Sequence, residues 1–257
     1  PIAAAVRADL AKQSATVDLN TKFDETSIAA KLGATKLEPL VATFDVAIDK
    51  LNVDRYVHPD AKDAKGGDGA IDLSPLKGKT VTGKFSAGAL TVKRVKLENV
   101  KAEIKLAGGK LEVSPHSANL YGGTLAGSLS ADANGNRFAV KETLQGVALG
   151  PLLRDAAQKD VLEGRGNVTV DVTTAGAAVP ALKRALAGGA SVVIKDGAVK
   201  GINLAESFRN AKSAMGAKSV QSDTRKQTDF SDMSASFQIA SGVARNSDLK
   251  AAAPFAR

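Results

Sequence analysis

Apolar and polar residues alternate along most of the chain, which is typical of β-strands that have one covered face. In residues 100–106, valine, alanine, isoleucine and leucine occupy one face, and two lysines and a glutamate occupy the other. The same period of two recurs in segments 44–48, 111–113, 125–131, 137–140, 168–172 and 236–240. Because the links are short and each segment has one apolar face, the pattern favours an antiparallel sheet.

Turn residues separate these segments. Asn134-Gly135 supplies the two positive-φ positions of a type I′ hairpin turn at low cost. Gly108-Gly109 and Asp196-Gly197 are further hairpin signals, and Gly122-Gly123 fits a hairpin, a bulge or a bend. Most of residues 80–145 is therefore predicted to be a meander of antiparallel strands.

Helical spacing appears mainly in the second half of the chain. Pro151 suits the first turn of a helix, Gly188-Gly189 suits the end of one, and Asn203 suits an N-cap. About three amphipathic helices are predicted, near 151–162, 180–187 and 203–215. They are expected to lie against the sheet or to plug its end.

One segment shows neither the period of two of a strand nor the spacing of a helix. Residues 59–72 are rich in charge, glycine and alanine, as in a flexible linker. This predicts an N-terminal β segment at 1–58, a linker at 59–72 and a C-terminal β-rich region with the helices at 73–257. Two pieces of one curved sheet separated by a loop would give the same pattern, so both arrangements stay open.

Composition narrows the functional classes. Aromatic residues make up only 4% of the chain, so the apolar surfaces are built from small aliphatic side chains. The chain has no cysteine, and no apolar run approaches the roughly 18 residues of a membrane span. The net charge of +8 is spread along alternating strands with few rings to stack bases. We therefore expect no nucleic-acid partner.

Motifs for catalysis or metal binding are incomplete. The sequence KGKTVTG resembles a phosphate-binding loop, but Leu73 stands where that motif needs its first glycine. The sequence DANGN has calcium-loop spacing, but Arg137 replaces the required glycine. His58 and His116 each lie beside a proline and are predicted to be surface or turn residues. We expect no catalytic residue, metal ion or cofactor, and no enzymatic activity, although paired carboxylates remain open.

Several segments match one known family in order and spacing. They include FDVAIDKLNVDRYVHP, LYGGTLAGSLSAD, GRGNVTVDVTTAG and LAGGASVVIKDGAVKGINLAESF, with further segments at 76–115 and 229–249. Together they cover nearly the whole chain. On these segments the chain resembles the AsmA family of Gram-negative envelope proteins.

The resemblance implies a periplasmic protein held in the inner membrane by an N-terminal helix and related to bridge-like lipid transfer proteins. The family fold it implies is mainly β (α+β), with a long curved antiparallel sheet that forms an open trough or partial barrel. Phospholipids are expected to pass along this apolar trough toward the outer membrane. We expect the chain to be the C-terminal periplasmic portion, with the anchor absent from this chain.

The expected function is binding of phospholipid acyl chains in an apolar β-groove, contributing to lipid transport between the two membranes. The candidate groove residues are Val100, Ile104, Leu106, Leu111, Val113, Leu125, Leu129, Val168, Val170, Val172, Val192 and Ile194. The alternative is a structural or interaction module that assists outer-membrane protein assembly, with assembly factors as partners. A third hypothesis is a periplasmic hydrolase that acts on envelope glycans and has two facing carboxylates.

Overall fold

The structure is a computed structural model that describes residues 2–9, 11–56, 70–201 and 227–252. Strands make up 71% of the structure. The strands are β1 (Ile2–Asp9), β2 (Ser14–Phe23), β3 (Thr26–Lys36), β4 (Val41–Asn52), β5 (Thr80–Val92), β6 (Val95–Ala107), β7 (Lys110–Leu120), β8 (Gly123–Asp132), β9 (Arg137–Ala148), β10 (Leu162–Ala175), β11 (Ala187–Lys200), β12 (Gln227–Ala240), β13 (Val243–Arg245) and β14 (Lys250–Ala252). The helices are α1 (Leu149–Ala157), α2 (Val179–Ala185) and the short 3₁₀ turns η1 (Val53–Arg55) and η2 (Ser74–Leu76).

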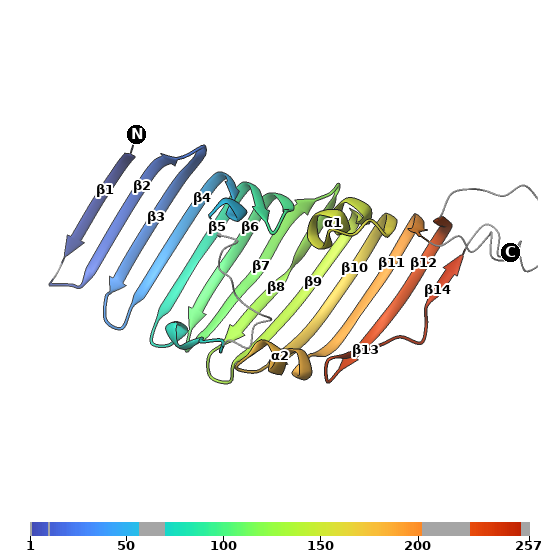
Figure 1. Ribbon diagram of the computed structural model, residues 1–257. Coiled ribbons are helices and arrows are strands. Elements are labelled where there is room, and N and C mark those ends of the chain that lie inside the picture. Colours follow the sequence, from blue (N-terminus) through green and yellow to red (C-terminus); the bar gives the residue numbers. More distant parts are fainter. Residues whose placement is uncertain (1, 10, 57–69, 202–226, 253–257) are drawn as a thin grey trace, which may run out of the picture.

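All these strands belong to one sheet, and their order in space is their order in the chain. The sheet runs from β1 to β13, and β14 pairs with β12. Figure 1 shows the strands side by side in a single layer, with α1 and α2 at opposite ends of the strands. The predicted mainly β architecture with a long open curved sheet is confirmed.

The positions of the turns follow the sequence signals with one exception. Hairpin turns at Gly108-Gly109 and Asn134-Gly135 join β6 to β7 and β8 to β9. The type I′ turn predicted at Asn134-Gly135 is wrong, because the link has four residues and its positive φ, 43°, falls on Asn136. Tyr121 and Gly122 link β7 to β8, with φ of 45° and 74°. The predicted meander over residues 80–145 is therefore present as β5 to β9.

The hairpin predicted at Asp196-Gly197 is wrong. These residues lie inside β11, where Lys195 pairs with Asp232 and Gly197 pairs with Phe230 of β12. The positive φ of Asp196, 49°, accompanies a register shift opposite β10 and makes no turn. A Cβ on Gly197 would lie 2.4 Å from the ring of Phe230, so the glycine makes room for that ring.

One strand pair departs from the antiparallel rule. β4 and β5 pair in parallel, with Val41 beside Thr80 and Asn52 beside Thr91. A parallel pair needs a long connection back to the starting end, and residues 53–79 provide it. The two strand-rich segments on either side of the predicted linker thus share one sheet. Within the described part of the connection, the Ile71 amide donates to the carbonyl of Ala177, 2.6 Å away.

The described residues contain two α-helices rather than about three. α1 ends at Ala157, before the predicted limit of 162, because Gln158 takes the left-handed conformation and its amide donates to the Arg154 carbonyl. The chain then enters β10 at Leu162. α2 lies within one to two residues of its prediction. The helix predicted at 203–215 lies outside the described residues.

The main hydrophobic core lies between α1 and the later strands. Leu149, Ile194 and Phe230 form a buried cluster, packed against partly buried side chains of Leu152, Leu162, Val168, Val192, Val199 and Met233. A Cβ on Gly166 would lie 2.7 Å from Leu149 Cδ1, so the absence of a side chain on β10 lets the start of α1 sit directly on the sheet.

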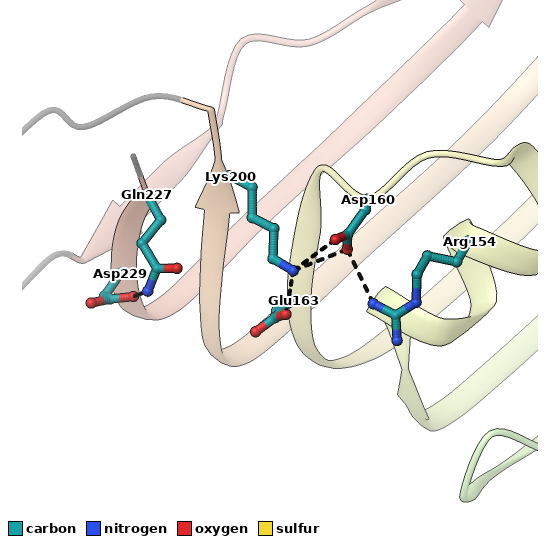
Figure 2. A network of polar contacts seen from close by, with 6 residues as sticks. All are labelled: Arg154, Asp160, Glu163, Lys200, Gln227 and Asp229. Carbon is teal, nitrogen blue, oxygen red and sulfur yellow. Dashed lines mark hydrogen bonds and ion pairs between the residues drawn. The ribbon is translucent and has the colours of Figure 1, made fainter. Parts of the chain in front are cut away.

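Ion pairs tie the loop after α1 to the end of β11 (Figure 2). Lys200 Nζ lies 3.0 Å from Asp160 Oδ2 and 2.5 Å from Glu163 Oε1. Arg154 Nη1 of α1 lies 3.1 Å from the same Asp160 carboxylate. The hydrogen bond from Lys200, followed by the one from Arg154, lowers the pKa of Asp160. This network fixes where α1 lies relative to the sheet.

Candidate functional site

One face of the sheet is apolar across its whole width. A single row of cross-strand neighbours takes one residue from each strand from β1 to β12. The row consists of Val6, Val17, Leu32, Phe44, Gly83, Ile104, Val113, Leu129, Val140, Val172, Gly188 and Ile239. At ~4.8 Å per strand the row is roughly 50 Å long. We call the surface that carries this row the apolar face.

Every residue predicted to line a groove lies on the apolar face. Leu106 faces Leu111 across β6 and β7, and Val170 faces Ala190 across β10 and β11. Another row contains Leu125, Leu144, Val168 and Val192. The remaining candidates, Val100, Ile104, Val113, Leu129, Val172 and Ile194, occupy the same side by strand periodicity and pairing. Their contact with lipid stays a prediction.

Coverage of the apolar face differs along the sheet. Ile194, near α1, is 1% exposed, whereas Leu129 is 40%, Leu32 is 42% and Val6 is 66% exposed. The described helices make their main contacts with β5, β6, β9 and β10. Among the described residues, Val6 and Leu32 of the single-layered β1 to β4 region thus remain open to a ligand or a partner, while Ala30 is buried.

A hollow of about 350 Å³ lies on the apolar face over β2 to β5. Its lining residues are Ala15, Val17, Leu32, Gly33, Ala34, Leu40, Ala42, Thr43, Phe44 and Val81. We call it the alanine hollow, because small side chains from three neighbouring strands meet there. Nearly all of these residues are apolar, so the hollow suits a hydrocarbon group.

The opposite face is polar and carries alternating charges. One row across β2 to β6 consists of Asp18, Lys31, Asp45, Lys84 and Glu103. A larger hollow of about 800 Å³ lies over this row. It is lined mainly by charged and hydroxyl-bearing residues of β1 to β7. Charges of both signs that neighbour each other across strands favour a solvated surface. This larger hollow therefore does not suit acyl chains.

A hydrogen-bonded histidine–glutamate pair interrupts the apolar face near its middle. His116 Nε2 of β7 lies 3.0 Å from the Glu142 carboxylate of β9, and His116 Nδ1 lies 3.3 Å from the Val113 carbonyl oxygen. The two side chains are only 12% and 15% exposed. Gly127 of β8 separates them, and a Cβ there would lie 2.4 Å from Glu142 Oε2. The missing side chain thus lets the pair meet across a strand.

This pair corrects the prediction that His116 is a surface or turn residue. It lies within β7 and is partly buried by its neighbours. Sequence reasoning missed it because His116 and Glu142 are 26 positions apart and meet only through the register of three strands. The available signal was Gly127, an isolated glycine in an alternating strand, which often marks a close approach.

A second group of contacts holds α1 over one end of the apolar face. The Tyr121 hydroxyl donates to Asp155 Oδ2 at 2.7 Å, and Arg94 Nε donates to the Asp155 carbonyl at 3.1 Å. The hydrogen bond from Tyr121 lowers the pKa of Asp155. Burial, and then the same hydrogen bond, raise the pKa of Tyr121. The turns before β6 and β8 are thereby fastened to the helix.

The described ranges hold neither a metal-binding cluster nor a membrane-spanning helix. Among residues 2–9, 11–56, 70–201 and 227–252, no three histidine, aspartate or glutamate side chains gather in a way that could hold a metal ion. Over the same part of the chain, no helix is both long and apolar enough to span a membrane.

Comparisons with known proteins identify the family. The model of the AsmA family matches residues 7–249, which is nearly the whole chain. No curated protein and no solved structure gives a significant match. The matched range includes the apolar face from β2 to β13, together with α1 and α2. The chain is therefore a member of the AsmA family of envelope proteins.

Proposed function

We propose that this protein binds phospholipid acyl chains on its apolar face and contributes to lipid transport between the inner and outer membranes. One observation carries the proposal: an apolar row crosses the single-layered sheet from β1 to β12, and several of its side chains are more than a third exposed. Exposed apolar surface of this continuity marks a binding surface in a soluble domain. Family membership supports a role in envelope biogenesis.

The energetics suit transport along the face. Each methylene group that leaves water gains about 0.8 kcal/mol, so a dozen would gain roughly 10 kcal/mol before the costs of binding. Aliphatic side chains impose no directional contact on a hydrocarbon chain. An acyl chain can therefore shift from one strand to the next and replace each contact by a similar one.

The proposal includes a place and a non-enzymatic role. We assign the protein to the periplasm, with attachment to the inner membrane. We assign it no catalytic step, because the apolar face offers aliphatic side chains and the His116–Glu142 pair makes its contacts within the sheet.

A second function is favoured by the edge of the sheet. β1 pairs with β2 and lies at the end of the strand order, so the backbone groups on its outer side face no described strand. Such an edge can accept an added strand from a partner. In this alternative the protein is an interaction module that assists outer-membrane protein assembly.

Lipid analysis of the purified protein tests the first function. Protein extracted from bacterial membranes is expected to retain phospholipid, detected by mass spectrometry. Leu129→Glu places a charge on the exposed part of the apolar face and should lower the retained lipid several-fold. Ala126→Glu places the same charge on the opposite face of the same strand and serves as the matched control.

Two results would contradict lipid binding. One is protein purified without phospholipid, and the other is an equal loss in both variants. An outer-membrane protein or assembly factor that stays bound after delipidation, and is lost when β1 is deleted, would support the interaction module instead.

A further inference from the structure

We infer that the alanine hollow is a seat for one acyl chain of a phospholipid, at the end of the apolar face farthest from α1. The inference rests on the proposed function and gives it a defined site. The hollow lies over β2 to β5, whereas α1 makes its main contacts with β6, β9 and β10 and α2 with β10.

The hollow results from a row of small side chains beside a row of large ones. Ala8, Ala15, Ala34 and Ala42 are cross-strand neighbours, and the same row continues through Val81, Leu106 and Leu111. The adjacent row over the same strands consists of Val6, Val17, Leu32 and Phe44. Methyl groups thus form the floor, and larger side chains rise along one side.

Two features hold the boundaries of the hollow in place. A Cβ on Gly83 would lie 2.4 Å from Phe44 Cδ1, so this glycine lets the ring lie against β5. Leu40, in the turn between β3 and β4, lines the hollow at the ends of the strands, and its carbonyl accepts a hydrogen bond from the Thr80 amide at 2.8 Å. The shape therefore depends on contacts within the sheet and exists before a ligand arrives.

The size fits one hydrocarbon chain. A volume of about 350 Å³ is at the low end of the roughly 300–1,000 Å³ range of small-molecule sites. At about 30 Å³ for a group the size of a water molecule, it holds roughly a dozen such groups. This is most of one acyl chain.

The chemistry of the floor favours a hydrocarbon chain over an extended peptide. β2, β3 and β4 each pair with a strand on both sides, so their backbone donors and acceptors are used in the sheet. A peptide strand laid across this face would lose hydration of its own amides without gaining partners. A hydrocarbon chain has no such groups and loses nothing.

A pair of variants tests the seat. Ala42→Phe fills the hollow, whereas Ala47→Phe adds the same ring to the exposed opposite face of the same strand. The probe is phosphatidylethanolamine vesicles that contain a phospholipid with a photoactivatable acyl chain, and cross-linked residues are mapped by mass spectrometry. Ala34→Leu is a milder filling variant, used if Ala42→Phe does not fold by its thermal unfolding transition.

In the wild-type protein, cross-links should map to residues of the alanine hollow. Each methylene group excluded from a site lowers affinity about fourfold, so blocking a few should lower the cross-linking of these residues by about tenfold or more. Ala47→Phe should leave it unchanged. Cross-links on Leu129 and Val172 with none in the hollow would overturn the seat and leave the proposed function standing, as would equal effects of the two phenylalanine variants. Absence of cross-links from the whole apolar face would contradict both.

Discussion

The two ends of the sheet differ in how far their apolar face is covered, although their strands have the same alternating pattern. Over β9 to β12, α1 lies on the apolar face and Leu149, Ile194 and Phe230 are buried. Over β1 to β4, Ala30 is buried, most other apolar side chains of β2 to β4 are partly exposed, and Leu32 and Val6 are 42% and 66% exposed. Both regions alternate apolar and polar residues with a period of two. Alternation therefore determines which face is apolar and does not determine whether that face is covered.

The difference separates a region built for stability from a region built for contact. Covered side chains lose water and gain packing within the protein, and both effects stabilise the fold. Exposed apolar side chains gain this free energy only when a ligand covers them. Stability in the open region then comes from the paired strands themselves, since β2 to β4 are hydrogen-bonded along both edges.

The largest expected effect is the loss of a large side chain in the covered region. Ile194→Ala should lower the free energy of unfolding by about 2–5 kcal/mol, because Ile194 is fully buried against Leu149 and Phe230. Leu32→Ala, in the open region, should cost about 1 kcal/mol or less. Urea denaturation measures both values. Val193→Ala, an exposed position next to Ile194, is the control, and equal effects at 194 and 32 would remove the distinction between the regions.

An intermediate effect is expected at the His116–Glu142 pair between the two regions. Glu142→Leu leaves His116 partly buried without its carboxylate and should cost about 1–3 kcal/mol. The double variant His116→Leu with Glu142→Leu should recover most of this loss, because it removes both polar side chains from the apolar face. A double-mutant cycle in urea denaturation measures the coupling. The exposed Lys141–Asp171 pair, with a coupling of about 0.2–1 kcal/mol, is the comparison. A coupling between His116 and Glu142 no larger than this would show that the pair contributes as little as a surface ion pair.

The smallest expected effect is a pH dependence of the contacts that hold α1. The hydrogen bond from Tyr121 lowers the pKa of Asp155 below its usual value of 3.8. Since the folded protein then binds this proton more weakly than the unfolded chain, the contribution is fully present above about pH 4 and is lost as the pH falls through the lowered pKa. Asp155→Asn should therefore show a shallower fall in the thermal unfolding midpoint between about pH 6 and about pH 3 than the wild-type protein.

Tyr121→Phe is the second variant for this measurement, because it removes the largest cause of the lowered pKa and keeps the carboxylate. It should also flatten the acid dependence. An unchanged slope in both variants would mean that Asp155 does not link the α1 contacts to pH.

The local features of the fold were predictable, and the features set by long-range register were not. Alternation placed Val100, Leu125 and Val168 on one face, and Asn134-Gly135 marked a real hairpin, because both signals act over a few residues. The parallel pairing of β4 with β5 depends on a connection that leaves the sheet and returns, which no local pattern encodes. Asp196-Gly197 has the composition of a turn but lies in a bulge, because β12 continues the ladder past it.

The candidate site divides in the same way. The apolar identity of its residues could be predicted from their spacing alone. The alanine hollow could not, since it depends on Ala15, Ala34 and Ala42 lying beside one another in three different strands. The His116–Glu142 pair has the same origin, with a glycine in the strand between its members.

Strand order has one further consequence, for how such a molecule changes length. Because every strand from β2 to β11 neighbours only the strands before and after it in the chain, the sheet resembles a stack of repeats more than a closed core. Inserting one hairpin at a tight turn would widen it by two strand spacings, about 10 Å, and leave the path of the rest of the chain unchanged. The width of the sheet is thus set by how many hairpins it contains. Evolution can change this width one hairpin at a time while the fold stays the same.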